Sequence, residues 1–216
     1  MKRLAIITVA MPLIIVLFGS CQEDINIDTS NPDTNNSDSV FTAKAKRTSM
    51  FDGSFDDMLD NSPCTAIQLP VNILLNNNPI TINNLSELPI IGESDVVEFS
   101  FPVTITNYNY EKVTVTEASQ FTKIREDCNL LIENGQGPIT CVDIIYPTTV
   151  FTATNGNIQN DFSLTNDEEL YFFLSNLGSS DRYSVKYPLN ITVGQGSVIT
   201  VNNDSELENL MDSCST

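Results

Sequence analysis

The sequence predicts an α+β protein of two tandem modules, each an antiparallel sheet with helices covering one face. Three observations support this prediction. Leu, Phe or Tyr followed by Pro occurs four times, and two alternating segments separated by a turn rich in Asn or Gly follow each copy. Such alternation predicts a β-hairpin. A helix-start signal follows each hairpin, and cysteines bracket the four copies in pairs.

The strands of each copy carry apolar residues on one face and Thr, Asn or Ser on the other, which favours an antiparallel sheet with one solvated face. The alternation continues through the repeated Pro, so we expect unbroken strands of about eleven residues, for example through Val97–Ile105 and Tyr183–Val193. Because Pro has no N–H, each such strand should lie at an edge or be bulged there. The repeated dipeptides are Leu69-Pro70, Phe101-Pro102, Tyr146-Pro147 and Tyr187-Pro188.

The helix starts have the three-residue spacing of a capping box, in which an N-cap side chain and an acidic or amide side chain satisfy free backbone N–H groups. In the first copy Pro89 limits the helix to a single turn. The pairs are Asn84 with Glu87, Asn166 with Glu169, Asn203 with Glu206 and, as an imperfect copy, Glu117 with Gln120. The unit is therefore ββα, repeated four times.

Four cysteines occupy matching places at the start and end of each pair of copies, and the repeat symmetry selects one of their three possible pairings. The predicted disulfides are Cys64–Cys128 and Cys141–Cys214. They define a first module, residues 51–130, and a second module, residues 139–216. The connecting segment contains two Gly and one Pro, which suits a domain boundary, so we expect the modules to fold separately.

The N-terminus predicts export. Residues 1–20 have a basic start and a 15-residue apolar run, which indicates a signal peptide and is too short for a comfortable membrane span. The segment Leu17–Cys21 resembles a bacterial lipobox, which implies cleavage before Cys21 and acylation of that residue. The acyl chains would then attach the protein to the membrane. Residues 21–50 are polar and are predicted to form a flexible tether.

Several short signals point to one group of bacteria. Glu23 and Asp24 follow the cysteine and resemble the acidic export tag of surface lipoproteins in the Bacteroidota. The segment Asp38-Ser39-Val40 resembles their O-glycosylation signal, which would modify Ser39. Together with Ser54–Asp57 and the Leu-Pro and Tyr-Pro segments, the chain resembles uncharacterised, largely flavobacterial lipoproteins. This resemblance implies an outer-membrane, cell-surface location and a repeat architecture, but no reaction.

Composition excludes much chemistry. The chain has 216 residues, a net charge of −18, and no His or Trp. Without His there is no Ser-His-Asp triad and no HExxH metal site. The acidic charge makes nucleic acid an unsuitable partner. No cofactor motif is present, and we expect no cofactor.

Three further clusters have competing interpretations. Asp56, Asp57 and Asp60 lack the spacing of a calcium loop and favour a short helix start. The acids at Asp167–Glu169 favour a first helical turn. Tyr108 and Tyr110 could stack on a sugar ring, although cross-strand packing is the preferred interpretation.

The sequence therefore favours a non-catalytic binding, adhesion or envelope-complex module that contacts glycan or protein at the cell surface. The alternative is a lipid-anchored hydrolase that uses carboxylates alone, which would need two of them flanking a cleft. The oligomeric state is open.

Overall fold

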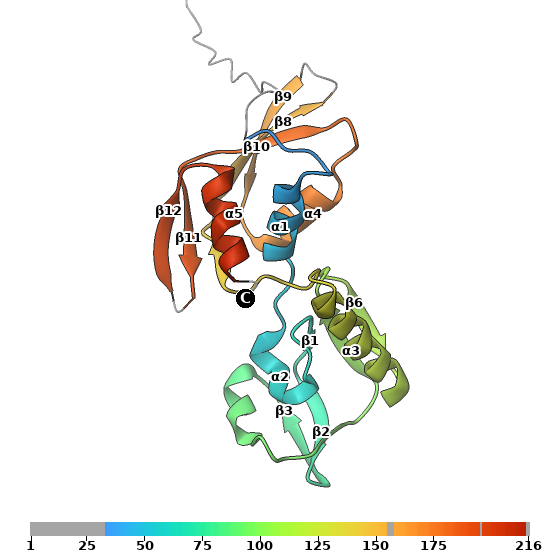
Figure 1. Ribbon diagram of the computed structural model, residues 1–216. Coiled ribbons are helices and arrows are strands. Elements are labelled where there is room, and N and C mark those ends of the chain that lie inside the picture. Colours follow the sequence, from blue (N-terminus) through green and yellow to red (C-terminus); the bar gives the residue numbers. More distant parts are fainter. Residues whose placement is uncertain (1–32, 155–157, 195, 215–216) are drawn as a thin grey trace, which may run out of the picture.

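In the computed structural model, which describes residues 33–154, 158–194 and 196–214, the chain forms the predicted α+β architecture. The helices and antiparallel strands surround two separate hydrophobic cores, one in each module (Figure 1). The residues of the proposed signal peptide and Cys21 lie outside the described part of the chain.

The first module extends to the end of helix α3 and has only one long helix. Pro89 lies inside η2, which is a 3₁₀-helix, as expected where an α-helix would lose a backbone hydrogen bond. The elements in chain order are η1 (Ser54–Asp56), α2 (Asp57–Asp60), β1 (Thr65–Ile67), β2 (Val71–Leu75), β3 (Asn78–Ile82), η2 (Leu85–Ile90), β4 (Val97–Phe99), β5 (Val103–Asn107), β6 (Lys112–Val115) and α3 (Ala118–Glu133).

The second module repeats this order with two complete α-helices, because neither copy has a Pro after its helix start. Its elements are β7 (Val142–Ile144), β8 (Thr148–Thr154), β9 (Ile158–Leu164), α4 (Asp167–Ser175), β10 (Arg182–Val185), β11 (Leu189–Val193), β12 (Ser197–Val201) and α5 (Asp204–Ser213).

Each module has two three-stranded sheets instead of the single sheet predicted. The strand that leads into one hairpin pairs with the other hairpin of the same module, which gives the orders β3-β2-β4 and β1-β5-β6, then β10-β8-β9 and β12-β11-β7. The prediction of unbroken eleven-residue strands is therefore wrong. The chain passes from one sheet to the other at each repeated Pro, which cannot donate to a β-ladder and whose preceding peptide bond is cis in all four copies.

The predicted cap bonds are confirmed at Asn166 and Asn203, whereas Asn84 caps the Ser86 N–H and the Glu117 side chain caps none. Asn166 and Asn203 accept hydrogen bonds from the N–H groups of Glu169 and Glu206, each at 2.9 Å. The glutamates reach back one residue beyond the cap, so that Glu169 accepts from the N–H of Thr165 at 2.7 Å. Corresponding return bonds to the residue before the cap join Gln120 with Thr116, Glu87 with Asn83, and Glu206 with Asn202.

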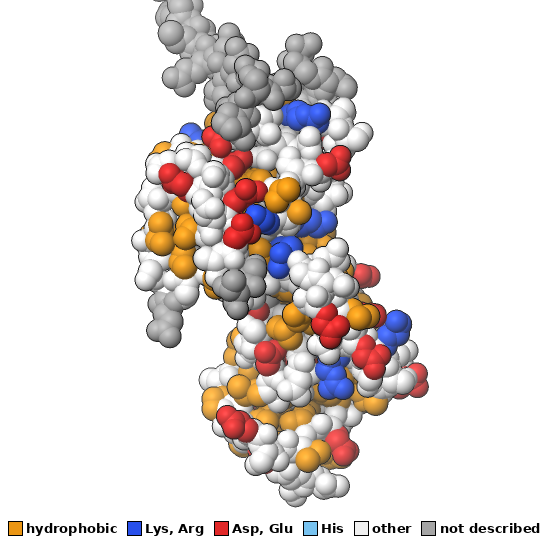
Figure 2. Space-filling view, viewed as in Figure 1, with side chains coloured by type: hydrophobic (Ala, Val, Ile, Leu, Met, Phe, Trp, Pro, Cys, Tyr) orange, Lys and Arg blue, Asp and Glu red, His pale blue; other side chains and the backbone are white. Residues whose placement is uncertain are grey.

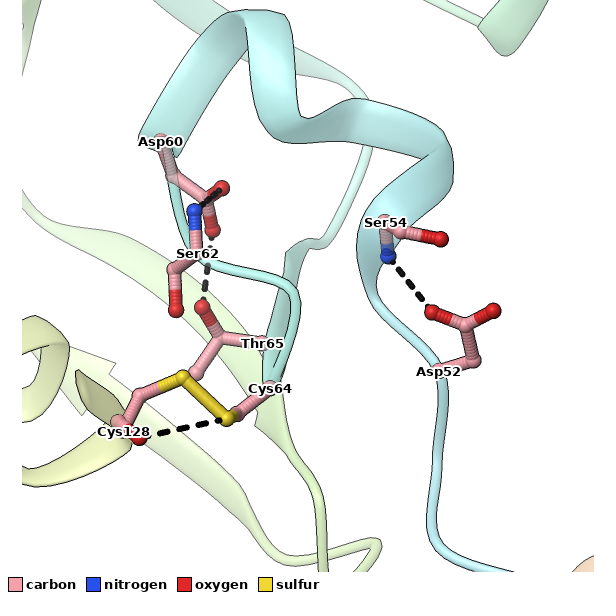
Figure 3. The surroundings of a disulfide bond; sticks show 7 residues. All are labelled: Asp52, Ser54, Asp60, Ser62, Cys64, Thr65 and Cys128. Atoms are coloured by element: carbon pink, nitrogen blue, oxygen red, sulfur yellow. Dashed lines mark hydrogen bonds between the residues drawn. A yellow bond between two sulfur atoms is a disulfide. The ribbon is translucent and has the colours of Figure 1, made fainter. Parts of the chain in front are cut away.

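The predicted disulfides are confirmed. Cys64 pairs with Cys128, and Cys141 pairs with Cys214, with Cα–Cα distances of 5.7 and 5.8 Å. Cys64 lies in a tight segment, residues 60–65, in which Asp60 accepts hydrogen bonds from the Ser62 N–H and the Thr65 hydroxyl (Figure 3). Each bond closes a loop that lies within one module, so it restricts the unfolded chain of that module alone.

The prediction of a tether through residue 50 is wrong for the residues that the structure describes. Val40–Thr48 form helix α1, which lies against α4 and α5 (Figure 1). Its Phe41 and Ala45 side chains belong to the core of the second module. Only these two apolar residues, at i and i+4, face that core, so the average composition of the segment concealed the helix. Upstream, Asn35 forms a two-way backbone bridge with Tyr183.

The first module is consequently inserted into the second. The chain leaves α1 at Thr48, builds the first module, and returns beside the point of departure, where the Ile139 N–H donates to the Arg47 carbonyl at 3.1 Å. Arg47 Nε also donates to the Gly137 carbonyl at 2.7 Å. Closely spaced chain ends are typical of an inserted domain.

Candidate functional site

A broad groove lies on the second module between β9 and α4. It has a volume of about 830 Å³. Phe162 on β9 and Phe172 on α4 line it and are 47% and 43% exposed, and the ring of Phe173 lies 6.2 Å from that of Phe162. Exposed aromatic rings beside polar groups are the usual composition of a contact surface.

Most carboxylates that line this groove hold backbone in place. Glu169 accepts from the Thr165 N–H, and Asp181 accepts from the Gly178 N–H at 2.7 Å. Only Glu168 of the lining acids has no such backbone bond among the described contacts. The groove therefore offers apolar rings and a negative charge, and it does not present a pair of unengaged carboxylates.

The contacts of Tyr110 lie within the protein and favour a structural role over stacking on a sugar ring. Tyr110 donates through its hydroxyl to the Ser49 carbonyl at 3.0 Å, and its ring lies 5.7 Å from Phe51 and 5.8 Å from Tyr171. Tyr171 belongs to the second module, so the predicted cross-strand packing of Tyr110 is replaced by packing across the junction between modules. An aromatic residue at a hairpin tip can reach a neighbouring module, and repeat symmetry within one module gives no sign of this.

Two of the clustered acids of the first module, Asp56 and Asp60, are buried and structural, whereas Asp57 is half-buried. Asp56 accepts from the Ile67 N–H at 2.7 Å, and burial raises its pKa to about 6. Asp60, only 1% exposed, accepts two hydrogen bonds, and burial raises its pKa to about 8 (Figure 3). No group of three or more acidic or thiol side chains among the described residues is arranged to hold a metal ion.

The second module carries a tyrosine–carboxylate pair in each copy. The Tyr146 hydroxyl donates to Asp167 at 2.7 Å, and the Tyr187 hydroxyl donates to Asp204 at 2.6 Å. Burial raises the pKa of Asp204 to about 6 and also raises the pKa of Asp167. Both tyrosines belong to the repeated Tyr-Pro dipeptide and both acids open a helix, so the pairs are part of the repeat architecture.

Two contacts that attach the N-terminal segment to the second module could not be predicted from the sequence. Asn35 donates through its side chain to Asp204, and the Thr42 hydroxyl lies 2.9 Å from that of Tyr183. Neither residue belongs to a recognisable motif. Ser39 is the N-cap of α1, and its hydroxyl accepts from the Asn36 N–H at 3.0 Å. Glycosylation of Ser39 stays a prediction.

The chain matches no protein-family model, and neither a curated protein nor a solved structure matches it. None of the helices in the described part of the chain has the length and hydropathy of a membrane span.

Proposed function

We propose that the protein is a lipid-anchored, cell-surface component of a Bacteroidota-type envelope that binds a glycan or a protein without catalysing a reaction. The lipobox-like segment ending at Cys21 supports the anchor. The observation that carries the binding role is the groove between β9 and α4, which combines exposed rings with carboxylates that are mostly held by backbone N–H groups.

The N-terminal segment packs on the second module instead of forming a tether through residue 50, and this defines how such a protein would be displayed. Eleven residues separate Cys21 from Asp33, so the chain could extend at most about 40 Å between them. The bridge from Asn35 to Tyr183 then fixes this connection to the second module. The first module, at the opposite end of the molecule from β10, would face outward (Figure 1).

Cys21→Ser tests the anchor. Cells that express wild type or Cys21→Ser are given a clickable fatty acid, and Ser39→Ala serves as the matched control because it leaves the lipobox intact. We expect label and membrane retention in wild type and control, and neither in Cys21→Ser. Equal labelling of all three would refute acylation at Cys21.

Surface display is tested separately by protease treatment of intact cells. The wild-type chain should be degraded, whereas Glu23→Ala combined with Asp24→Ala should be protected if these acids direct export to the surface. Protection of the wild-type chain would place it on the periplasmic face instead.

A photo-crosslinking amino acid tests the groove on living cells. It is placed at Phe162 or, as a control, at Ile90, an exposed apolar residue of the first module. A defined adduct from position 162 alone supports the binding role. No adduct from position 162 would contradict the binding role. A hydrolytic turnover lost on Glu168→Gln would contradict it and favour the hydrolase.

A further inference from the structure

Strand β12 has an unprotected edge. Each of the four sheets has two edge strands, and in β12 four of the five residues are exposed, with Val198 63% and Ile199 37% accessible. No strand among the described residues pairs with its outer edge (Figure 1). A free edge presents unpaired N–H and C=O groups that can pair with another chain.

Each of the other seven edge strands that the structure describes has a feature that opposes pairing with another chain. Pro79 interrupts β3, and β1 is three residues long and fully buried. Charged side chains lie on the rest, where they oppose pairing. These are Glu98 on β4, Lys112 on β6, Asp143 on β7, Asp161 on β9 and Arg182 on β10. In β12, by contrast, the sequence Ser-Val-Ile-Thr-Val contains neither a charge nor a proline.

The equivalent hairpin of the first module shows that this difference is specific. In the pairing register, Val201 lies opposite Leu189 as Ile82 lies opposite Val71, so Val198 of β12 corresponds to Pro79 of β3. The protecting proline of the first copy is therefore replaced in the fourth by an exposed β-branched residue. Such residues favour strand pairing.

Charge indicates what kind of partner can pair there. The protein carries a net charge of −18, so two copies repel each other over most of their surfaces. Residues 187–203, which include the whole β11–β12 hairpin, contain no charged side chain. Figure 2 shows hydrophobic side chains gathered at the surface over this hairpin. A second copy can approach this edge without bringing like charges together.

We propose that two copies of the chain pair antiparallel through β12 about a two-fold axis. With the axis at Ile199, that residue faces its own copy, and Val198 faces the partner's Thr200. Both are pairs of β-branched side chains, which stabilise cross-strand contacts. The sheet β12-β11-β7 then continues across the axis into a six-stranded sheet, and the interface is isologous.

Sedimentation velocity over a concentration series tests the proposal. A chain of residues 21–216 that carries Cys21→Ser is used, so that no acyl chain contributes to association. We expect a reversible dimer in this parent, and Val198→Pro should weaken its association about tenfold or more. The native register of β3 accommodates Pro79, so the hairpin should remain folded, which circular dichroism checks. Val198→Lys provides a second variant that keeps the N–H.

Ile90→Lys is the matched control, because Ile90 is 62% exposed and lies on the other module. It should dimerise like the parent. Pro79→Val removes the protection from β3 and should produce association beyond the dimer. A parent that is monomeric up to about 1 mM, or a dimer that survives both changes at Val198, would overturn the proposal. Pairing of β12 with an upstream segment of its own chain would give that monomeric result.

Discussion

The two modules share one architecture but hold it together with different side chains. In the first module the residue before each repeated Pro is Leu69 or Phe101, and the equivalent helices open with Leu85 and Ala118. In the second module the same places hold the pairs Tyr146–Asp167 and Tyr187–Asp204. Apolar residues and a hydrogen-bonded pair can therefore occupy the same two positions of one repeat.

The modules also differ in completeness. The first core is built from residues between Leu59 and Ile124, whereas the second includes Phe41 and Ala45 from the far side of the insertion. Helix α1 packs against both α4 and α5, so we expect the second module to depend on it. Symmetry in sequence thus does not imply equal independence in folding.

Phe41→Ala should have the largest effect of any single change considered. Phe41 is 4% exposed in the second core, so its truncation should lower the free energy of unfolding of that module by about 3–5 kcal/mol. Val40→Ala, at a 65% exposed position of the same helix, should change it by less than about 0.5 kcal/mol. Native-state hydrogen exchange of β8 and β11 measures both. Equal effects would mean that α1 does not belong to the core.

Stability should fall as the pH rises from about 4 to about 8, most of all in the first module. The pKa of Asp60 is raised from 3.8 to about 8, so the folded state keeps a proton that the unfolded state releases. The pKa of Asp204 in the second module is raised only to about 6, so its contribution to stability is lost over a narrower pH range. Chemical denaturation across this range provides the measurement, and Asp60→Asn should flatten the profile. Stability that rises with pH would contradict this.

Tyr187→Phe should lower the free energy of unfolding by about 1.5–3 kcal/mol, because Asp204 loses a buried charge-assisted hydrogen bond. The comparison between modules can be sharpened by transplanting the pair. Phe101→Tyr and Ala118→Asp should each destabilise the first module, and the double variant should recover about 1 kcal/mol relative to their sum. Strict additivity would show that the two sites are not equivalent.

Thr148→Val should give the smallest effect, a gain of about 1 kcal/mol. The residue after each repeated Pro is Val71, Val103 or Leu189 in the other copies, and it is Thr only here. Its buried hydroxyl has no hydrogen-bond partner among the described residues, so an apolar isostere removes a desolvation penalty. Thermal unfolding measures this, and a lower transition would reveal a partner for the hydroxyl.

The features predicted from the sequence are those fixed by local chemistry or by repeat symmetry. The caps at Asn166 and Asn203 need only neighbours three residues away, and the cysteine positions leave one symmetrical pairing. Helix α1 and the exchange of strands between sheets depend on contacts distant in sequence, with no local signal at Phe41 or Asn35. The groove likewise forms only when β9 and α4 bring Phe162 and Phe172 to one surface of the folded module.

The central claim is that the first module is inserted into a second module that is incomplete without α1. Three oxidised chains test it directly by calorimetry: residues 51–138, residues 139–216, and residues 33–49 joined by a short Gly-Ser linker to residues 139–216. The first and third should each unfold cooperatively. In the third, a short linker suffices because the Ile139 N–H lies within hydrogen-bond distance of the Arg47 carbonyl. Residues 139–216 alone, the predicted second module, should show no cooperative transition. A transition in that fragment equal to that of the joined chain would contradict the account.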